Sequence, residues 1–354
     1  MRTTLCDRLG IAVPIIQAPM AGVWTTPALV AAVAEAGGLG TLAGARITPA
    51  QLHEQIGETR RRTSRPFGVN FLLAPPAPPE ADGPSAPGIL HELRRRLGLP
   101  EDPPAPPVAA SVDEGVEIAL SAVVPVISFA MGSPAPWVDR VHAAGALVVA
   151  AATTVAEAEA VEAAGADIVV AQGAEAGGHR STFGPDPFDP LPLVGTMALV
   201  PAVVDAVGIP VVAAGGIMDG RGIVAALALG AAGVQLGTRF LLAAESGTPP
   251  SYRRRLLRAI ETETAVTDAY SGRAARGLRN AFIGAFDAAG VRPLGWPRQG
   301  AAAADIYRAS MDDDGDWAPL FAGQGVRLGR REQPAAEIVR ELVEDTRRVR
   351  EGLR

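Results

Sequence analysis

Short apolar runs alternate along most of the chain with longer segments that carry helix start and stop signals. The runs are rich in Val, Ile and Ala, which is typical of parallel strands buried on both faces. Eight such strands with intervening helices in about 240 residues predict an α/β fold, a TIM (β/α)8 barrel. The predicted strands are 14–18, 39–43, 67–72, 125–129, 147–151, 167–171, 209–214 and 233–236.

Helical segments fill the intervals between these runs. Thr26 followed by Pro27 is a strong helix start, and Gly37-Gly38 ends the same helix. A doubly wound sheet is disfavoured because no dinucleotide fingerprint is present: Gly38 and Gly40 are followed by Gly44, where a glycine at position 43 is required. The predicted barrel helices are 26–36, 49–62, 112–121, 136–144, 155–164, 196–207 and 220–229.

Two segments depart from the alternation. Residues 74–107 form a proline-rich insertion around a short helix at 89–97, and composition does not decide between a cover for the barrel mouth and a solvated loop. Beyond Phe240 the chain becomes rich in arginine, with a helix predicted from 252 to about 263 and irregular pieces up to 317. The predicted units are a barrel at 1–243, a smaller, mostly helical substrate-side subdomain at 244–317, and a C-terminal segment at 318–354 that returns to the barrel and ends in a charged outer helix at 334–349.

Composition favours a small-molecule ligand. The net charge is −6, so neither nucleic acid nor an anionic membrane is expected as a partner. The single cysteine has no disulfide partner, and the four histidines show no metal-ligand spacing, so no metal is expected. The N-terminus lacks a leader pattern and no apolar tract is long enough to span a bilayer, which predicts a cytoplasmic protein.

Two features of the sequence exclude classes of site. The chain contains no lysine, which excludes Schiff-base aldolases, pyridoxal-phosphate enzymes and P-loop nucleotidases, since each needs a lysine amine. Any phosphate must then be bound by backbone N–H groups, hydroxyls or arginine. The acidic stretch 312–316 lacks the spacing and the glutamate of an EF-hand, and it is predicted to be a solvated turn.

The segment 171–180, Ala-Gln-Gly-Ala-Glu-Ala-Gly-Gly-His-Arg, directly follows a predicted strand, and barrel active sites lie at the carboxyl ends of the strands. Small residues around His179 let a flat ligand approach the backbone, and an imidazole exchanges protons near neutral pH. His179 is therefore the candidate catalytic residue; a surface histidine in a glycine-rich turn is the alternative. Glu175 is either a second base or, in preference, a side chain that orients the loop amides.

Other strand ends are predicted to face the same site. They include Ala18-Pro19-Met20 after the first strand and Asn70 near the end of the third. The loops after strands seven and eight are where barrels commonly bind phosphate through backbone amides. Because these loops contain 215–216 (Gly-Gly) and 237–238 (Gly-Thr), the sequence predicts a phosphorylated ligand.

Six motifs occur in order: Pro14-Ile-Ile-Gln-Ala-Pro-Met20, Gly68-Val-Asn70, Gln172-Gly-Ala-Glu-Ala-Gly-Gly-His179-Arg180, Ala214-Gly-Gly-Ile217, Gln235-Leu-Gly-Thr-Arg-Phe240 and Leu320-Phe-Ala-Gly-Gln-Gly325. Together they resemble the flavin-dependent nitronate monooxygenases, formerly called 2-nitropropane dioxygenases. The resemblance implies a TIM barrel that binds FMN non-covalently. It also implies oxidative denitrification of alkyl nitronates such as propionate 3-nitronate by O2, through a flavin semiquinone.

The resemblance also assigns roles to residues. His179 would be the catalytic residue facing the substrate, and Gln324 and Trp296 would lie on the substrate side. The cofactor-binding residues would be Ala18, Pro19, Met20, Asn70, Gln172, Gly177, Gly178, Gly215, Gly216, Gln235, Leu236, Gly237 and Thr238.

Two positions depart from the family pattern. Ser181 stands where the family has glycine, and Trp296-Pro297 replaces Tyr-Pro, which leaves open the nitronate that fits. The same barrel and histidine loop also resemble FMN-dependent NAD(P)H reductases of enoyl thioesters or quinones, and a non-catalytic flavin protein is a third alternative. The segment 320–325 favours the monooxygenase. A homodimer is compatible with the sequence.

Overall fold

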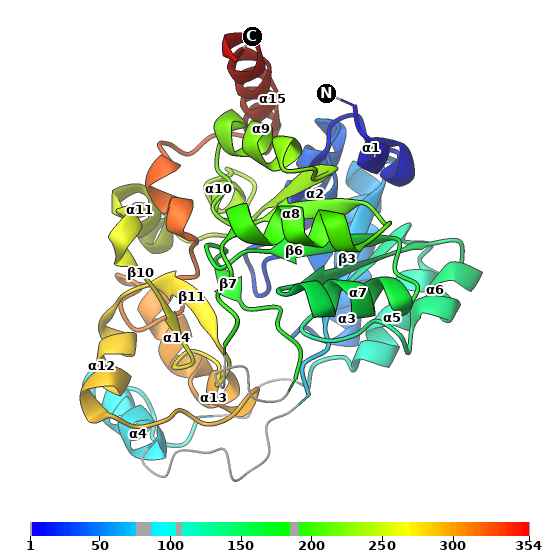
Figure 1. Ribbon diagram of the computed structural model, residues 1–354. Helices are drawn as coiled ribbons and strands as arrows, with labels where there is room; N and C mark the ends of the chain where they lie inside the picture. Colours follow the sequence, from blue (N-terminus) through cyan, green and yellow to red (C-terminus); the bar gives the residue numbers. More distant parts are fainter. Residues whose placement is uncertain (1, 76–85, 104–107, 185–190, 354) are drawn as a thin grey trace.

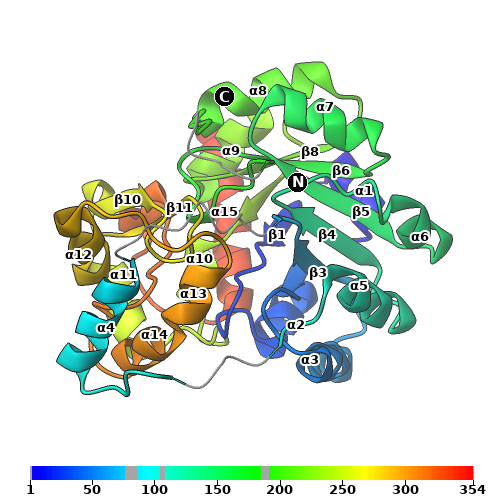
Figure 2. The same ribbon diagram turned by 90° about the horizontal axis from the view of Figure 1, so that it is seen from below.

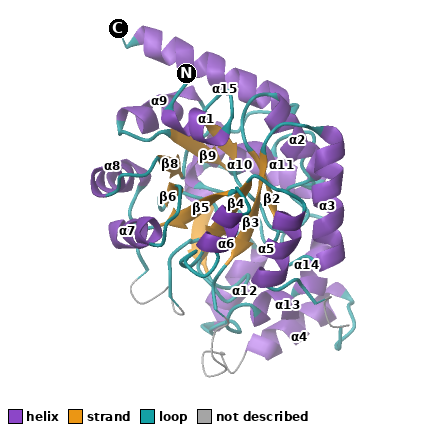
Figure 3. Ribbon diagram, turned by 90° about the vertical axis from the view of Figure 1, so that its right-hand side faces the viewer, coloured by secondary structure: helices purple, strands orange, loops and turns teal. Residues whose placement is uncertain are grey.

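The apolar runs form a barrel of eight parallel strands in a computed structural model that describes residues 2–75, 86–103, 108–184 and 191–353 (Figures 1 and 3). The barrel helices lie around the outside of this sheet. The strands are β1 (Ile15–Gln17), β2 (Gly40–Ala43), β3 (Phe67–Leu72), β4 (Val126–Ala130), β5 (Leu147–Ala152), β6 (Ile168–Gln172), β8 (Val211–Ala214) and β9 (Gly233–Leu236).

The sheet closes between its first and last strands. Its order is β1-β9-β8-β6-β5-β4-β3-β2, and β1 meets β2 where the N–H of Gln17 donates to the carbonyl of Leu39 (2.8 Å) and the N–H of Leu39 donates to the carbonyl of Ile15 (2.9 Å). The side-chain carbonyl of Gln17 accepts the N–H of Thr41 at 3.1 Å. The predicted TIM barrel is therefore confirmed.

Neighbouring residues on each strand point to opposite sides of the barrel wall. Val148 and Val169 pack in the cluster between sheet and helices, whereas Val149 and Val170 belong to the cluster inside the barrel. The inner cluster also contains Leu5 of α1 (Thr4–Leu9), a helix that the sequence analysis did not predict. Because α1 is short and the side chain of its N-cap residue, Thr3, makes no capping hydrogen bond to the helix, it has no local start signal of the kind carried by Thr26.

The outer helices begin and end close to the predicted positions. The hydroxyl of Thr26 accepts the N–H of Leu29 at 3.0 Å, as its position before Pro27 predicts. Helix α15, the charged C-terminal helix, packs outside the barrel against α2 and α9. These helices are α2 (Pro27–Glu35), α3 (Pro49–Arg62), α5 (Val112–Ser121), α6 (Val138–Ala143), α7 (Val155–Ala163), α8 (Thr196–Ala206), α9 (Gly220–Ala228) and α15 (Ala335–Gly352). A further short helix that the sequence analysis did not predict, α10 (Thr238–Leu241), follows β9.

A second, smaller unit lies beside the barrel and contains more regular structure than the sequence predicts (Figures 1 and 2). The helix expected to reach 263 ends at Arg258, and the chain continues into an antiparallel β-hairpin. The region expected to be irregular up to 317 contains three helices. The elements are α11 (Pro250–Arg258), η2 (Glu261–Glu263), β10 (Thr264–Thr267), β11 (Ala275–Leu278), α12 (Ala281–Ala289), α13 (Arg298–Ala302), α14 (Ala304–Met311) and η3 (Gln324–Leu328).

The described part of the proline-rich insertion packs on this smaller unit. Leu90 and Leu93 of α4 (Ala86–Leu97) join the cluster that contains Phe282, and Arg94 forms a largely buried ion pair with Asp305 of α14 at 2.8 Å. Residues 76–85 and 104–107 of the insertion lie outside the described residues. Helix α4 thus extends the second unit, and none of the residues that line the central cavity comes from it. No helix in the described ranges is long and apolar enough to cross a membrane.

Candidate active site

A cavity of about 250 Å³ opens at the carboxyl ends of the barrel strands. Trp296 and Gln324 do not line it, and the side chain of Gln324 is exposed. Every other residue that the sequence assigned to the site lines this cavity: Ala18, Pro19, Met20, Asn70, Gln172, Gly177, Gly178, His179, Gly215, Gly216, Gln235, Leu236, Gly237 and Thr238.

His179 is held by a strand that the sequence analysis interpreted as part of a loop. Gly178 and His179 form β7 (Gly178–His179), which pairs antiparallel with β11 so that His179 lies opposite Ala275. The side-chain N–H of Gln172 donates to the carbonyl of His179 at 3.0 Å, and its carbonyl accepts the N–H of Ser181 at 2.9 Å. The amide of Gln172, predicted to contact the cofactor, therefore fixes the histidine strand.

Three arginines hold the rest of the histidine loop. Arg180 and Arg273 are at most 1% exposed, and Arg276 lies on β11. Each donates to backbone carbonyls of the loop, at distances of 2.5–3.1 Å. The accepting carbonyls belong to residues 172, 173, 174, 182 and 184. A loop that reads as flexible from its glycines is thus tied to the second unit by charged hydrogen bonds.

The imidazole of His179 lies between aromatic rings. Its centroid is 5.1 Å from that of Trp296 and 5.3 Å from that of Phe321. Burial, reinforced by the positive charges of Arg46 and Arg273, lowers the pKa of His179 to about 3. The ring is therefore neutral at physiological pH.

Ser271 contacts one nitrogen of the imidazole ring. Its hydroxyl oxygen is 2.7 Å from Nε2 of His179, and the same hydroxyl lies 3.3 Å from the carbonyl of Arg273, to which it can donate. When the hydroxyl donates to that carbonyl, its oxygen accepts the N–H of Nε2, and Nδ1 carries the lone pair. Among the described residues Nδ1 has no hydrogen-bond partner.

We expect His179 to remain neutral from about pH 5 to 8, because its pKa is lowered from 6.5 to about 3. Between about pH 3 and 6.5, the two pKa values, the unfolded chain binds more protons at this group than the native chain does. The contribution of His179 to the free energy of unfolding therefore increases as the pH rises through this range and decreases as the pH falls. In an NMR titration, the imidazole signal that disappears in His179→Asn should not shift between about pH 5 and 8. A midpoint near 6.5 would contradict this assignment.

Glu175 has a structural partner. Its carboxylate accepts the N–H and the hydroxyl of Thr196, both at 2.8 Å, at the start of α8. Its carbonyl accepts the N–H of Gln324 at 2.9 Å. These contacts support the interpretation of Glu175 as an orienting side chain in preference to a second base.

The C-terminal segment reaches the site through close backbone packing. A Cβ on Gly177 would lie 2.6 Å from the backbone of Ala322 and Gly323, so glycine is required there. The N–H of Gly323 donates to the hydroxyl of Thr238 at 3.0 Å. This packing brings Phe321 to the imidazole, whereas Gln324 contributes only its backbone.

Several lining residues were missed by the sequence analysis. Arg46 follows β2, Met131 follows β4, and Ser128 on β4 accepts the side-chain N–H of Asn70 at 2.9 Å. Tyr252 reaches the cavity from α11. Met131 lies immediately beyond the end of β4 and Arg46 shortly beyond the end of β2, so applying the strand-end rule to β2 and β4 would have found them.

The loops after β8 and β9 offer free backbone donors. Gly215 and Gly216 have φ of 122° and 70°, conformations that favour glycine. Among the described residues, no backbone hydrogen bond is donated by the N–H of Gly216, Gly237 or Thr238. Unpaired N–H groups around a cavity end fit the binding of a phosphate in a chain without lysine.

A profile of the nitronate monooxygenase family matches residues 2–345 of the chain. The chain belongs to this family. A probable nitronate monooxygenase of Staphylococcus aureus (strain Newman) is 39% identical over 350 residues, covering 97% of this chain and 96% of the relative. The family is one of flavin-dependent oxidoreductases, and the cavity fits that assignment.

Solved structures share the fold over the whole chain. The nitroalkane oxidase from Streptomyces ansochromogenes superposes with a TM-score of 0.91 at 38% identity and covers 99% of both chains. FabK from Thermotoga maritima superposes with a TM-score of 0.78 at 32% identity, covering 100% of this chain and 98% of its own. The barrel and the second unit are therefore both shared with these two proteins.

Proposed function

We propose that the protein binds FMN and oxidises alkyl nitronates of the propionate 3-nitronate kind with O2. The observation that carries this proposal is a neutral imidazole with a free Nδ1, half-buried between Trp296 and Phe321 beside the cavity. Membership of the nitronate monooxygenase family and similarity to a nitroalkane oxidase support the same reaction class.

FMN would be held by the two glycine loops and the strand ends. Its phosphate would accept from the backbone N–H groups of Gly216, Gly237 and Thr238, which donate to no backbone carbonyl in the described ranges. Its ring would lie near Met20 and Asn70, which line the cavity. When bound, the flavin supplies the electron acceptor.

His179 would handle the proton when a neutral nitroalkane binds. The α C–H bond breaks, the proton goes to Nδ1, and its electron pair remains on the substrate as the nitronate. A nitronate that binds directly needs no such step. The positive charges of Arg46 and Arg273, which act on His179, would favour the anion, and the rings of Trp296 and Phe321 would exclude water.

A reductase is the second candidate, and the similarity to FabK is the observation that favours it. A reductase must hold a nicotinamide dinucleotide against the flavin, with a site for the second phosphate group. The lining of the cavity includes one arginine, Arg46. A small anion pocket beside His179 is sufficient for a nitronate oxidase.

An anaerobic experiment distinguishes the two candidate functions, because each predicts a different electron donor for the bound flavin. We expect propionate 3-nitronate to bleach the flavin absorbance rapidly, whereas excess NADH or NADPH leaves it oxidised, because the cavity offers the nitronate an anion pocket. Flavin released by heat should be FMN. Rapid bleaching by NADPH with no response to nitronate would favour the reductase, and released FAD would overturn the cofactor assignment.

A further inference from the structure

The cavity lining contains one arginine, Arg46, whose guanidinium has no anionic partner among the described residues. Arg46 lines the cavity together with residues that include no Asp or Glu among the described ones. Since His179 is neutral, Arg46 is the residue of that lining whose side chain carries a permanent charge. The chain contains no lysine, so a substrate anion in the cavity would form an ion pair with Arg46.

The backbone around Arg46 holds it in a defined position. Its φ is 66°, in the left-handed region that few residues other than glycine adopt. On one side the N–H of Gly44 donates to the carbonyl of Asn70 at 2.8 Å, and on the other the carbonyl of Ile47 accepts from Ala110 at 2.9 Å. Thr48 then caps α3. A strained residue fixed from both sides at a cavity is typical of a functional position.

The guanidinium of Arg46 reaches from the barrel to the second unit. A Cβ on Gly300 of α13 would lie 3.2 Å from one of its terminal nitrogens, so the missing side chain at 300 leaves room for it. Its charge also acts on the imidazole of His179. Among the described residues Arg46 has no ion pair, unlike Arg94, which pairs with Asp305.

We propose that Arg46 binds a second anionic group of the substrate, a carboxylate, and thereby selects nitronates that carry one over unsubstituted alkyl nitronates. This inference rests on the proposed function. The guanidinium is a rigid fork that matches the two oxygens of a carboxylate. Because the charge of Arg46 acts on the imidazole of His179, a substrate bound beside that ring lies in the field of the guanidinium.

The test compares two nitronates on the FMN-loaded enzyme. Propionate 3-nitronate carries the carboxylate, and butyl-1-nitronate has a similar length without it. In Arg46→Gln, kcat/KM for propionate 3-nitronate should fall about 10- to 150-fold, the range for a hydrogen bond to a charged group. The value for butyl-1-nitronate should change less than about threefold, and Arg46→Lys should recover part of the loss.

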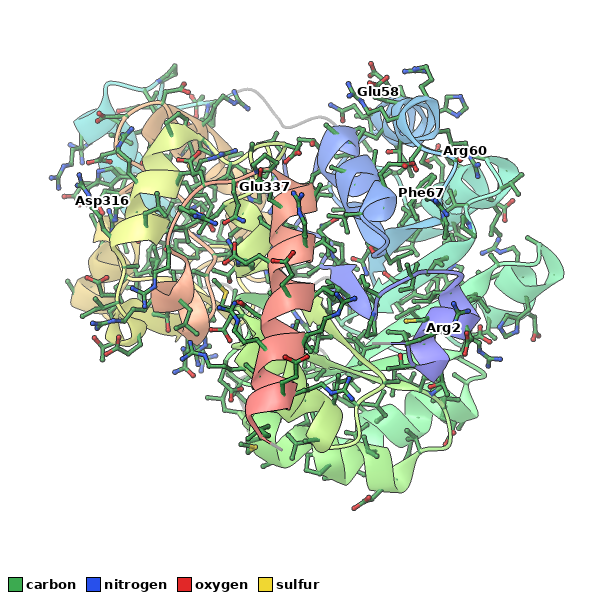
Figure 4. All side chains as sticks on the ribbon, turned by 90° about the horizontal axis from the view of Figure 1, so that it is seen from above. Arg2, Glu58, Arg60, Phe67, Asp316 and Glu337 are labelled. Carbon is green, nitrogen blue, oxygen red and sulfur yellow. The ribbon has the colours of Figure 1, made fainter. Side chains whose placement is uncertain are left out.

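Arg60→Gln is the matched control, because it removes the same charge from the outer helix α3. Arg60 lies over the ring of Phe67, 5.5 Å from its centroid, on the outside of the barrel (Figure 4), and it does not line the cavity. It should leave both rates unchanged. Flavin absorbance and thermal melting should match the parent in every variant.

Succinate binding, measured by calorimetry on the same proteins, gives a readout that does not depend on turnover. Binding that is lost in Arg46→Gln and retained in Arg60→Gln supports the proposal even if the parent oxidises neither nitronate, in which case only the proposed function fails. Equal losses for both nitronates, or unchanged succinate binding, would overturn the role of Arg46. A loss confined to reduction by NADPH would assign it to a dinucleotide phosphate and also overturn the proposal.

Discussion

Replacing His179 with asparagine should lower kcat/KM for a neutral nitroalkane by about 10²- to 10⁴-fold, the usual contribution of a general base. Asparagine is shorter than the ring and does not reach the position of Nε2, which lies 2.7 Å from the hydroxyl of Ser271 in the parent, and its amide cannot take the α-proton. The pre-formed nitronate needs no deprotonation, so its rate should fall much less. Steady-state rates on nitroethane and ethyl nitronate measure the difference.

The surface residue His142 provides the control for this substitution. Its Nε2 is 2.9 Å from a carboxylate oxygen of Asp167, outside the cavity lining, so His142→Asn should keep both rates. If His179→Asn retained full rates on both substrates at every pH tested, the imidazole would have no part in the reaction. An equal loss on both would make it a binding residue instead of a base.

Replacing Gly237 with leucine should yield a folded protein without flavin. The φ of Gly237 is −105°, which other residues adopt easily, and a Cβ there would have Ala18, at 3.7 Å, as its nearest neighbour. The leucine side chain would thus enter the cavity beside the free N–H groups without a clash in the wall. We expect the ratio of flavin to protein absorbance to fall at least about tenfold, because filling the site removes contacts that FMN needs.

The stability of this variant must be compared with flavin-free parent protein, because a bound ligand raises the melting temperature by mass action. The two should melt within a few degrees of each other and give the same circular dichroism. Gly284→Leu is the matched control, since a Cβ on Gly284 meets no atom within 4 Å. Normal flavin content in Gly237→Leu would contradict the assignment of the phosphate loops, and an unfolded protein would contradict the expectation that the wall has room for the side chain. Gly216 is less suitable because its φ of 70° adds backbone strain to any substitution.

The barrel could be predicted from sequence because each strand is specified locally. Runs such as 167–171 are apolar throughout, and their neighbours carry helix caps, so order and number of strands follow without long-range information. The same argument placed the glycine loops, since strand ends share one face of a barrel. Helix α1 was missed because its place depends on packing against the barrel interior.

The surroundings of His179 could not be predicted in the same way. Its hydrogen-bond partner Ser271 is 92 residues away in the chain, and nothing near Ser271 marks it as a partner. Strand β7 is two residues long, too short for any periodicity to appear. The low pKa of the imidazole depends on rings and charges from four separate segments, including Phe321 and Arg46.

Because β7 pairs with β11, the orientation of the candidate catalytic side chain, His179, is set by the second unit and not by the barrel strands. Successive residues of a strand face opposite sides, so a slip of one residue between His179 and Ala275 would turn the imidazole from the cavity to the other face. Insertions or deletions in the hairpin of the second unit would therefore abolish the reaction that depends on His179, while the loops that bind the cofactor stay intact. Residues 264–278 therefore determine the orientation of His179, although His179 lies almost a hundred positions earlier in the chain.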